Sequence, residues 1–175
     1  MEKIVFGGGC FWCTEVLFLS IKGVISVTPG YAGGNLANPN YDMVSGGNTG
    51  HAEVILIEYD SEIIKLEKLL DIFFDSHDPT TLNKQGNDIG TQYRSILLYS
   101  TKEQFETIKS YISKIENLKI FKGPITTEVT PLINFYPAEE YHKKYYEKHP
   151  NESYSKFIIE PKIKKLKEHF SNYLK

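Results

Sequence analysis

The positions of hydrophobic residues along the chain predict strands that alternate with helices. Five stretches are apolar or β-branched and read as strands: residues 3–6, 24–27, 52–59, 95–99 and 126–131. We expect the second of these strands to end at Pro29-Gly30, because this dipeptide is a strong turn signal. The strands are separated by segments of different periodicity, so the chain does not resemble an all-β protein.

Apolar residues at helical spacing predict the helices. They occupy five segments: residues 11–21, 66–76, 101–115, 138–148 and 161–170. Thr101 and Gln104 have the form of a capping box at the start of the third helix. Pro161 opens the last helix, which places Ile163, Leu166 and Phe170 inward and the lysines outward.

Two long polar segments, residues 31–50 and 77–92, lack periodicity and are rich in Gly and Asn. Loops of this length in a compact domain are uncommon and usually functional, so binding and catalytic groups are expected there. We find no internal repeat and no linker. Residues 1–175 are therefore expected to form a single domain of the α+β or α/β class with a mixed sheet.

Composition and charge exclude several function classes. The formal net charge of −2 argues against general binding of nucleic acid, which needs a basic excess. No apolar segment approaches the length of a membrane span, and the first residues lack the pattern of a signal peptide. We therefore expect a cytoplasmic protein, in which a C-x-x-C pair indicates redox or metal chemistry rather than a structural disulfide.

Both cysteines and the only tryptophan lie within Phe6-Gly7-Gly8-Gly9-Cys10-Phe11-Trp12-Cys13. The glycines form a tight turn between a strand and a helix, which places Cys10 at the helix start. Unpaired backbone N–H groups there favour a thiolate, so we expect a lowered pKa and a nucleophile. The alternative is a small buried core residue.

Cys13 lies one helical turn beyond Cys10, so it is either a resolving thiol that forms a disulfide with Cys10 or a buried core residue. Zinc is the rival use of the pair. A zinc site would need two histidine ligands, but no two histidines have the usual spacing of a zinc-binding pair. We therefore expect no metal.

Glu53 begins the strand at 52–59, where alternation places it on the same face as Ile55 and Ile57. In a closed pocket its pKa would rise and it could serve as a general acid, whereas in solvent it would be an ordinary carboxylate. In the long loops, Tyr41 and Tyr93 are either hydrogen-bond donors to a substrate oxygen or packing residues.

Several further blocks then identify a family. Gly8-Gly9-Cys10-Phe11-Trp12 resembles the active-site signature of the A-type methionine sulfoxide reductases, the peptide-methionine (S)-S-oxide reductases. The other blocks follow in family order: Asn38-Pro39-Asn40-Tyr41, Thr49-Gly50-His51-Ala52-Glu53-Val54, His77-Asp78-Pro79-Thr80, Gly86-Asn87-Asp88-Ile89-Gly90-Thr91-Gln92-Tyr93-Arg94-Ser95 and Ala138-Glu139-Glu140-Tyr141-His142. The resemblance covers most of the chain. It implies a two-layer α/β sandwich of the ferredoxin-like kind, with no cofactor.

The resemblance also implies roles for individual residues. Cys10 matches the family's nucleophile, and Phe11 and Trp12 match the walls of the pocket for the substrate methyl group. On the oxygen side, Glu53 matches the acid. The remaining matches are two hydroxyls on the sulfoxide oxygen and a supporting polar residue: Tyr41, Tyr93 and Asp88.

The chain departs from the family pattern at Cys13, where many members have Gly and place resolving cysteines near the C-terminus. Here residues 157–175 contain no cysteine, so Cys13 is the sole internal candidate. We expect Cys10 to become a sulfenic acid, Cys13 to form a disulfide with it, and thioredoxin or a similar dithiol to reduce that disulfide.

The expected substrate is the S epimer of methionine sulfoxide, free or in exposed protein segments, and a monomer is expected. Two other classes of function stay open. A C-x-x-C thiol–disulfide oxidoreductase acting on protein disulfides would explain the cysteines but not Glu53 or the tyrosines. A non-enzymatic module that binds a sulfoxide or a metal would need no thiol turnover.

Overall fold

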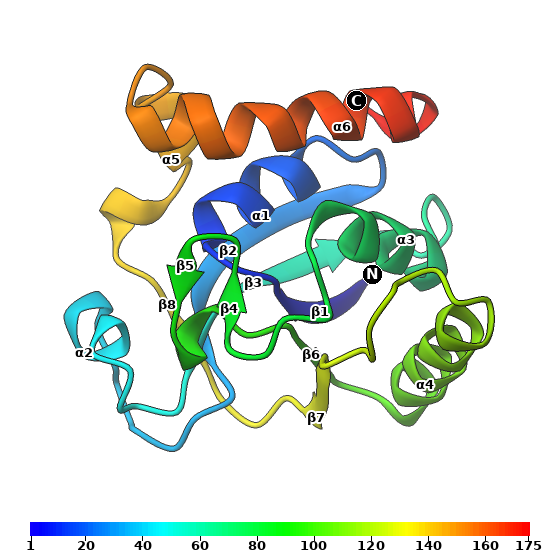
Figure 1. Ribbon diagram of the computed structural model, residues 1–175, viewed down its shortest axis with the longest axis horizontal. Coiled ribbons are helices and arrows are strands. Elements are labelled where there is room, and N and C mark those ends of the chain that lie inside the picture. Colours follow the sequence, from blue (N-terminus) through cyan, green and yellow to red (C-terminus); the bar gives the residue numbers. More distant parts are fainter.

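A six-stranded sheet forms the centre of the structure, a computed structural model that describes residues 1–175 (Figure 1). Its strands are β1 (Glu2–Gly7), β2 (Val24–Ala32), β3 (Ala52–Tyr59), β6 (Ile96–Tyr99), β7 (Glu128–Pro131) and β8 (Phe135–Pro137). They lie in the order β7-β6-β1-β3-β2-β8, and all neighbours are antiparallel except β6 and β7. A separate two-stranded hairpin consists of β4 (Lys84–Gln85) and β5 (Asp88–Ile89).

Six α-helices accompany the sheets: α1 (Phe11–Leu19), α2 (Tyr41–Ser45), α3 (Leu66–Ser76), α4 (Lys102–Asn117), α5 (Tyr145–Lys148) and α6 (Glu160–Phe170). In Figure 1, α6 (red) crosses over α1 (blue), and the two helices are in contact. Short helical turns complete the chain: Thr91–Tyr93, Glu140–His142, the π-type turn Ser155–Ile159 and Ser171–Tyr173.

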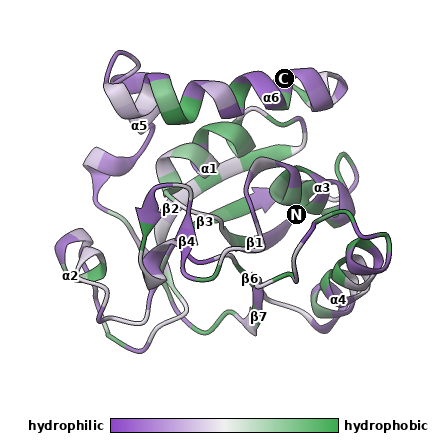
Figure 2. Ribbon diagram, viewed as in Figure 1, coloured by the Kyte–Doolittle hydropathy of each residue, from purple (hydrophilic) through white to green (hydrophobic).

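The main hydrophobic core lies between one face of the sheet and the helices. It contains 26 buried residues, among them Phe6 of β1, Phe18 of α1 and Phe73 of α3. The rings of Phe6 and Phe18 meet edge to face with centroids 5.5 Å apart. Burying one such ring stabilises the fold by roughly 1.5–3 kcal/mol. Figure 2 shows the consequence: α1 and the strands beneath it are hydrophobic, whereas α6 carries many hydrophilic residues.

A smaller cluster of six buried residues, including Val5 and Val54, lies on the opposite face of the sheet. The alternation predicted for β3 is therefore confirmed, since Ile55 and Ile57 belong to the main core and Val54 to the smaller cluster. The predicted mixed α+β architecture is confirmed too. The central strands and the helices α1 and α3 follow the order β-α-β-β-α-β, but β7 and β8 extend the sheet, and the ferredoxin-like assignment stays a prediction.

The expectation that the second strand ends at Pro29-Gly30 is wrong, because β2 continues to Ala32. The carbonyl of Pro29 accepts a bond from the N–H of Ala138, beside the end of β8. The N–H and C=O of one residue point to the same side in an antiparallel ladder. The N–H that proline lacks therefore faces that side, and the pairing of β2 with β3 loses no bond.

The prediction of one helix over residues 138–148 is also wrong. Two short turns form instead, Glu140–His142 and α5, and they are separated by Lys144 in a left-handed conformation with φ 53°. The buried carboxylate of Glu15 on α1 accepts the Lys144 N–H at 2.8 Å. This tertiary contact fixes a backbone that local helical periodicity cannot predict.

The two long loops are more structured than their sequence indicates. The first contains α2, and the second contains the β4–β5 hairpin and the turn Thr91–Tyr93. His51 holds the first loop closed: its Nδ1 accepts the Gly34 N–H at 3.0 Å and its Nε2 lies 2.7 Å from the carbonyl of Leu36. The strand β8 is a further element that the sequence pattern does not indicate.

Candidate active site

The strand β1 and the helix α1 place Cys10 at the N-cap of α1 (φ −63°, ψ 130°). The preceding turn requires Gly9, whose φ of +93° lies in the left-handed region. A Cβ on Gly9 would also lie 2.8 Å from the side chain of Gln85. This turn places the thiol just beyond the end of the central strand β1, where Cys10 is 8% exposed.

The expected lowering of the Cys10 pKa is wrong. Burial raises the pKa of the Cys10 thiol well above its ordinary value, and the nearby Glu53 and Cys13 raise it further. A hydrogen bond from the backbone of Trp12 lowers it, as the helix start predicts, but by less than burial raises it. The first free N–H of the helix, that of Phe11, binds the carboxylate of Glu53 instead.

Glu53 lies on β3 beneath the start of α1 and is 2% exposed. Its Oε1 accepts the Phe11 N–H at 3.2 Å. Burial raises the pKa of Glu53 to about 8, the Phe11 N–H opposes this rise, and the charge of Asp88 adds to it. At neutral pH the carboxyl group is therefore mostly protonated. A neutral thiol and a neutral acid lie side by side.

Phe11 and Trp12 project from the first turn of α1 to different degrees. Phe11 is buried in the core, with its ring centroid 5.7 Å from that of Tyr31 and 5.1 Å from that of His142. Trp12 is partly buried and stacks on Tyr145 at 3.6 Å with the rings almost parallel. Trp12 thus provides partly exposed apolar surface next to Cys10, whereas Phe11 is covered.

His142 orients Trp12. The indole Nε1–H donates to His142 Nδ1 at 3.0 Å, so this imidazole carries its proton on Nε2 when neutral. Nε2 is buried and has no hydrogen-bond partner. Burial lowers the pKa of His142, which favours the neutral form that the indole needs.

Tyr41, Tyr93 and Asp88 come from the two long loops. Tyr41 begins α2, with its ring 4.5 Å from His142, and its backbone N–H donates to Glu139 at 3.0 Å. Burial raises the pKa of Tyr41 and of Tyr93, and Glu53 is the next cause for both. The structure therefore brings both phenols into electrostatic range of the buried acid, and both keep their protons at neutral pH.

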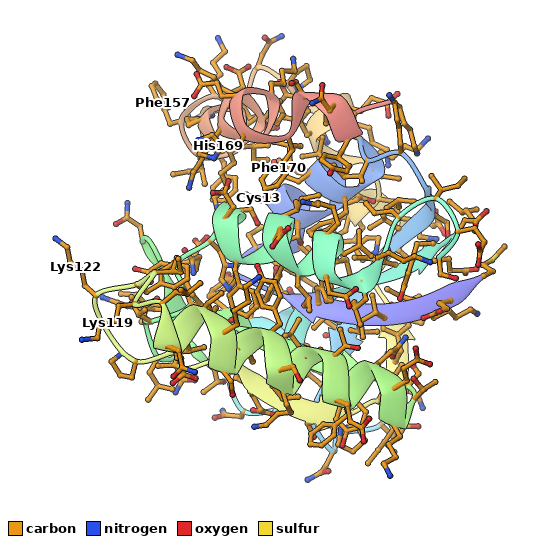
Figure 3. The ribbon with its side chains drawn as sticks, turned by 90° about the vertical axis from the view of Figure 1, so that its right-hand side faces the viewer. Cys13, Lys119, Lys122, Phe157, His169 and Phe170 are labelled. Carbon is orange, nitrogen blue, oxygen red and sulfur yellow. The ribbon has the colours of Figure 1, made fainter.

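Cys13 lies on the side of α1 that faces the C-terminal helix, and Figure 3 shows it beneath that helix. Its thiol donates to the hydroxyl of Tyr154 at 3.9 Å, and burial raises its pKa to about 11. The Tyr154 hydroxyl in turn donates to Asp88 at 2.7 Å. Both cysteines are free thiols.

A cavity of about 430 Å³ separates the β4–β5 hairpin from the C-terminal segment. It is lined by both thiols and by residues from these two elements: Cys10, Cys13, Gln85, Gly86, Asn87, Asp88, Tyr154, Phe157, Ile158, Pro161 and Lys162. A larger depression of about 540 Å³ shares Gln85, Pro161 and Lys162 with it but contains no thiol. The smaller cavity is therefore the one that bears on thiol chemistry.

Sequence reasoning assigned no role to four residues that hold this site together: Glu139, His142, Tyr145 and Tyr154. Glu139 and His142 fall within one of the family blocks, which is the only signal that could have identified them. Tyr154 is 141 residues from the cysteine that it contacts, and its own surroundings in the sequence give no signal.

Neither a metal-binding cluster nor a membrane-spanning helix is present. No group of three or more His, Cys, Asp or Glu side chains is arranged to hold a metal ion. None of the helices combines the length and the apolar character needed to cross a bilayer.

Known proteins with similar sequence and structure share one activity. The family model described as "Peptide methionine sulfoxide reductase" matches residues 2–174. A protein from Psychrobacter cryohalolentis named "Peptide methionine sulfoxide reductase MsrA" is 49% identical over 174 residues, covering 99% of each chain. The crystal structure of Mxr1 from Saccharomyces cerevisiae in reduced form superposes with a TM-score of 0.79 at 36% identity, covering 86% of this chain and 87% of Mxr1.

A second structure of the yeast protein, Mxr1 in complex with Trx2, is similar with a TM-score of 0.56. It is 25% identical and covers 82% of this chain and 84% of the matched chain.

Proposed function

The chain belongs to the peptide methionine sulfoxide reductase family, and on that premise we propose that Cys10, Glu53 and Cys13 carry out its reaction. The enzyme reduces methionine sulfoxide to methionine. One observation carries the assignment of the chemical step: the buried Glu53 carboxyl group, whose pKa burial raises to about 8, binds the N–H of Phe11, the residue next to the buried Cys10. A protonated acid beside a nucleophile is what reduction of a sulfoxide requires.

In the first step, the Cys10 sulfur attacks the electrophilic sulfur of the substrate. Glu53 gives its proton to the sulfoxide oxygen as negative charge builds there, and the proton of the Cys10 thiol replaces it on Glu53. The oxygen moves from the methionine sulfur to the cysteine sulfur. Methionine leaves, Cys10 is a sulfenic acid, and the carboxyl group is ready for another cycle.

The remaining site residues bind the substrate. Phe11 and Trp12 contact the S-methyl group, and a sulfur–aromatic contact contributes roughly 0.3–1.5 kcal/mol. Tyr41 and Tyr93 donate to the sulfoxide oxygen, which their raised pKa values support because a phenol must keep its proton to donate. An asymmetric pocket of this kind accepts one sulfoxide epimer, and we assign it the S epimer.

In the second step, Cys13 attacks the Cys10 sulfenic acid and water leaves, which forms a disulfide. A dithiol protein then reduces the disulfide by thiol exchange. The yeast relative solved in complex with Trx2 supports thioredoxin as this partner. The need for a reduced dithiol supports a cytoplasmic location. The proposed enzyme is a monomer that acts on free or protein-bound methionine sulfoxide.

A thiol count tests the proposal. Reduced enzyme is incubated with an excess of each sulfoxide epimer and no reductant, and free thiols and methionine are measured. We expect the S epimer to consume two thiols and release about one methionine per enzyme, as the chemistry of the sulfenic acid requires. Cys10→Ser is the control and should release none. Loss of thiols without methionine would favour a thiol–disulfide oxidoreductase instead.

A further inference from the structure

The hydroxyl of Tyr154 joins the Cys13 thiol to the Asp88 carboxylate. The Cys13 thiol donates to it at 3.9 Å, and it donates to the Asp88 carboxylate at 2.7 Å. It lines the same cavity as the Cys10 thiol. The chain of donors runs in one direction, from the Cys13 sulfur through the phenol to the carboxylate.

The position of Tyr154 is fixed from several sides. The edge of its ring lies against the face of Trp12, with centroids 5.6 Å apart and planes at 84°. The next residue, Ser155, is fully buried, and its hydroxyl donates to the carbonyl of His149 at 2.6 Å. Tyr154 therefore cannot move away from the sulfurs without unpacking the turn that precedes α6.

We propose that Tyr154, oriented by Asp88, transfers the proton in the step that joins Cys10 and Cys13. This inference rests on the proposed function, in which Cys13 attacks the Cys10 sulfenic acid. Asp88 acts through Tyr154 and is a positioning residue, whereas Tyr154 contacts the attacking sulfur of Cys13 and lines the cavity that also contains Cys10.

The step balances without an added reagent. The S–H bond of Cys13 and the S–O bond of the Cys10 sulfenic acid break, and an S–S bond forms. The Cys13 proton passes to the Tyr154 oxygen while the phenol passes its own proton through the hydrogen bond to Asp88. The proton then returns to the hydroxide that leaves Cys10, which departs as water, and the tyrosine and the carboxylate end as they began.

Cys13 needs this help because its thiol is a reluctant nucleophile. Its pKa of about 11 leaves very little thiolate at neutral pH. Lys162 favours the thiolate electrostatically, but its ammonium group donates to the carbonyl of Ser76 at 3.1 Å. Glu53 is bound to the Phe11 N–H on the other side of Cys10. Tyr154 is the group in hydrogen-bond contact with the Cys13 sulfur.

The cavity beside the two sulfurs supplies the space for the step. Its volume of about 430 Å³ is larger than the volume that a few water molecules occupy, at about 30 Å³ for each molecule in the liquid. Cys10, Cys13, Asp88 and Tyr154 all line it. The Cys13 side chain therefore has room to turn toward Cys10, and the water that forms has a way out.

The test separates the two steps in the variant Tyr154→Phe. Reduced enzyme is mixed with S-methionine sulfoxide in a rapid-quench instrument, and methionine, remaining thiols and trapped sulfenic acid are measured over time. We expect methionine to form within about threefold of the wild-type rate, whereas disulfide formation slows by about 10²-fold or more, the usual contribution of an acid–base group. Sulfenic acid should accumulate.

The pH dependence distinguishes proton transfer from a packing role. Without Tyr154, the attacking thiolate must come from hydroxide, so disulfide formation should accelerate about tenfold per pH unit below the Cys13 pKa of about 11. Wild-type enzyme should show a much flatter profile. Asp88→Asn should slow the same step with a smaller effect. Tyr146→Phe is the matched control, because its hydroxyl binds Glu160 on the exposed surface.

Disulfide formation at the wild-type rate in Tyr154→Phe would overturn the inference, and so would a pH profile parallel to that of wild type. A methionine step slowed as much as the disulfide step would assign Tyr154 to substrate binding instead, which also overturns it. Failure of the proposed function has a different signature, since wild-type enzyme would then release no methionine or Cys10→Ser would remain active.

Discussion

Replacing Glu53 with Gln should make the enzyme more stable and far less active. The carboxyl group is 2% exposed, and its pKa rises from 4.5 to about 8 on folding. Between these values the unfolded chain has lost the proton while the folded protein keeps it. Because the folded state binds more protons, raising the pH destabilises it. Glutamine keeps the shape of the side chain and can still accept the Phe11 N–H, but it cannot ionise in the unfolded chain.

The magnitude follows from the two pKa values of Glu53. Each pH unit between 4.5 and about 8 reduces the free energy of unfolding of the wild type by about 1.4 kcal/mol relative to the variant. The accumulated difference is about 3 kcal/mol at pH 7 and about 4 kcal/mol at pH 8, where the folded protein is itself half ionised at Glu53. The free energy of unfolding of a typical domain is roughly 5–15 kcal/mol, so this difference is a large part of it.

Urea unfolding of both proteins at pH 5, 6, 7 and 8 measures this difference. The change in packing caused by Gln shifts the two curves by a constant, whereas the titration of Glu53 makes them diverge with pH. The other ionisable groups that titrate below pH 8 are shared, so they cancel. Parallel curves would refute the reasoning. Single-turnover release of methionine should fall by about 10²–10⁴-fold in the same variant, because the general acid is missing.

Three further predictions concern other residues. Cys13→Ser should release about one methionine per enzyme and then stop, because Cys10 stays a sulfenic acid; full turnover with thioredoxin would contradict this. Gly9→Ala should lower the free energy of unfolding in urea by at least about 1 kcal/mol, because φ is +93° and the new Cβ would lie 2.8 Å from Gln85; an unchanged midpoint would show that the turn relaxes freely. Burial lowers the pKa of His77 from 6.5 to about 4, so the unfolded chain binds a proton that the folded protein does not. As the pH drops from 6.5 to 4, the free energy of unfolding of the wild type in urea should fall relative to that of His77→Gln by about 1.4 kcal/mol per pH unit. Identical slopes of stability against pH would rule this out.

Features that depend on neighbouring residues could be predicted from the sequence. The bounds predicted for β3 and α3, residues 52–59 and 66–76, are those that the structure shows. Alternation along β3 also placed Glu53 on the core face, and the Gly-rich turn placed Cys10 at a helix start. In each case, periodicity or turn chemistry acts within a few residues, so the signal is complete in the local sequence.

Features that depend on burial or on distant contacts could not be predicted. The helix start does favour the Cys10 thiolate, but desolvation outweighs it, and desolvation depends on what the fold places over the sulfur. The irregular backbone at Lys144 follows from one bond to Glu15, which is 129 residues away. Tyr154 reaches Cys13 only because α6 folds back over α1.

In the proposed mechanism, the raised pKa values of Cys10 and Glu53 explain how the chemistry can be confined to sulfoxides. Two neutral groups form a weak nucleophile beside an acid, and neither reacts until something accepts a proton. The sulfoxide oxygen is such an acceptor, and protonation by Glu53 makes the carboxylate available to take the proton from Cys10. The thiolate therefore forms only as the substrate is polarised. We also expect the Cys10 thiol to react slowly with peroxides, because its raised pKa leaves little of the reactive thiolate.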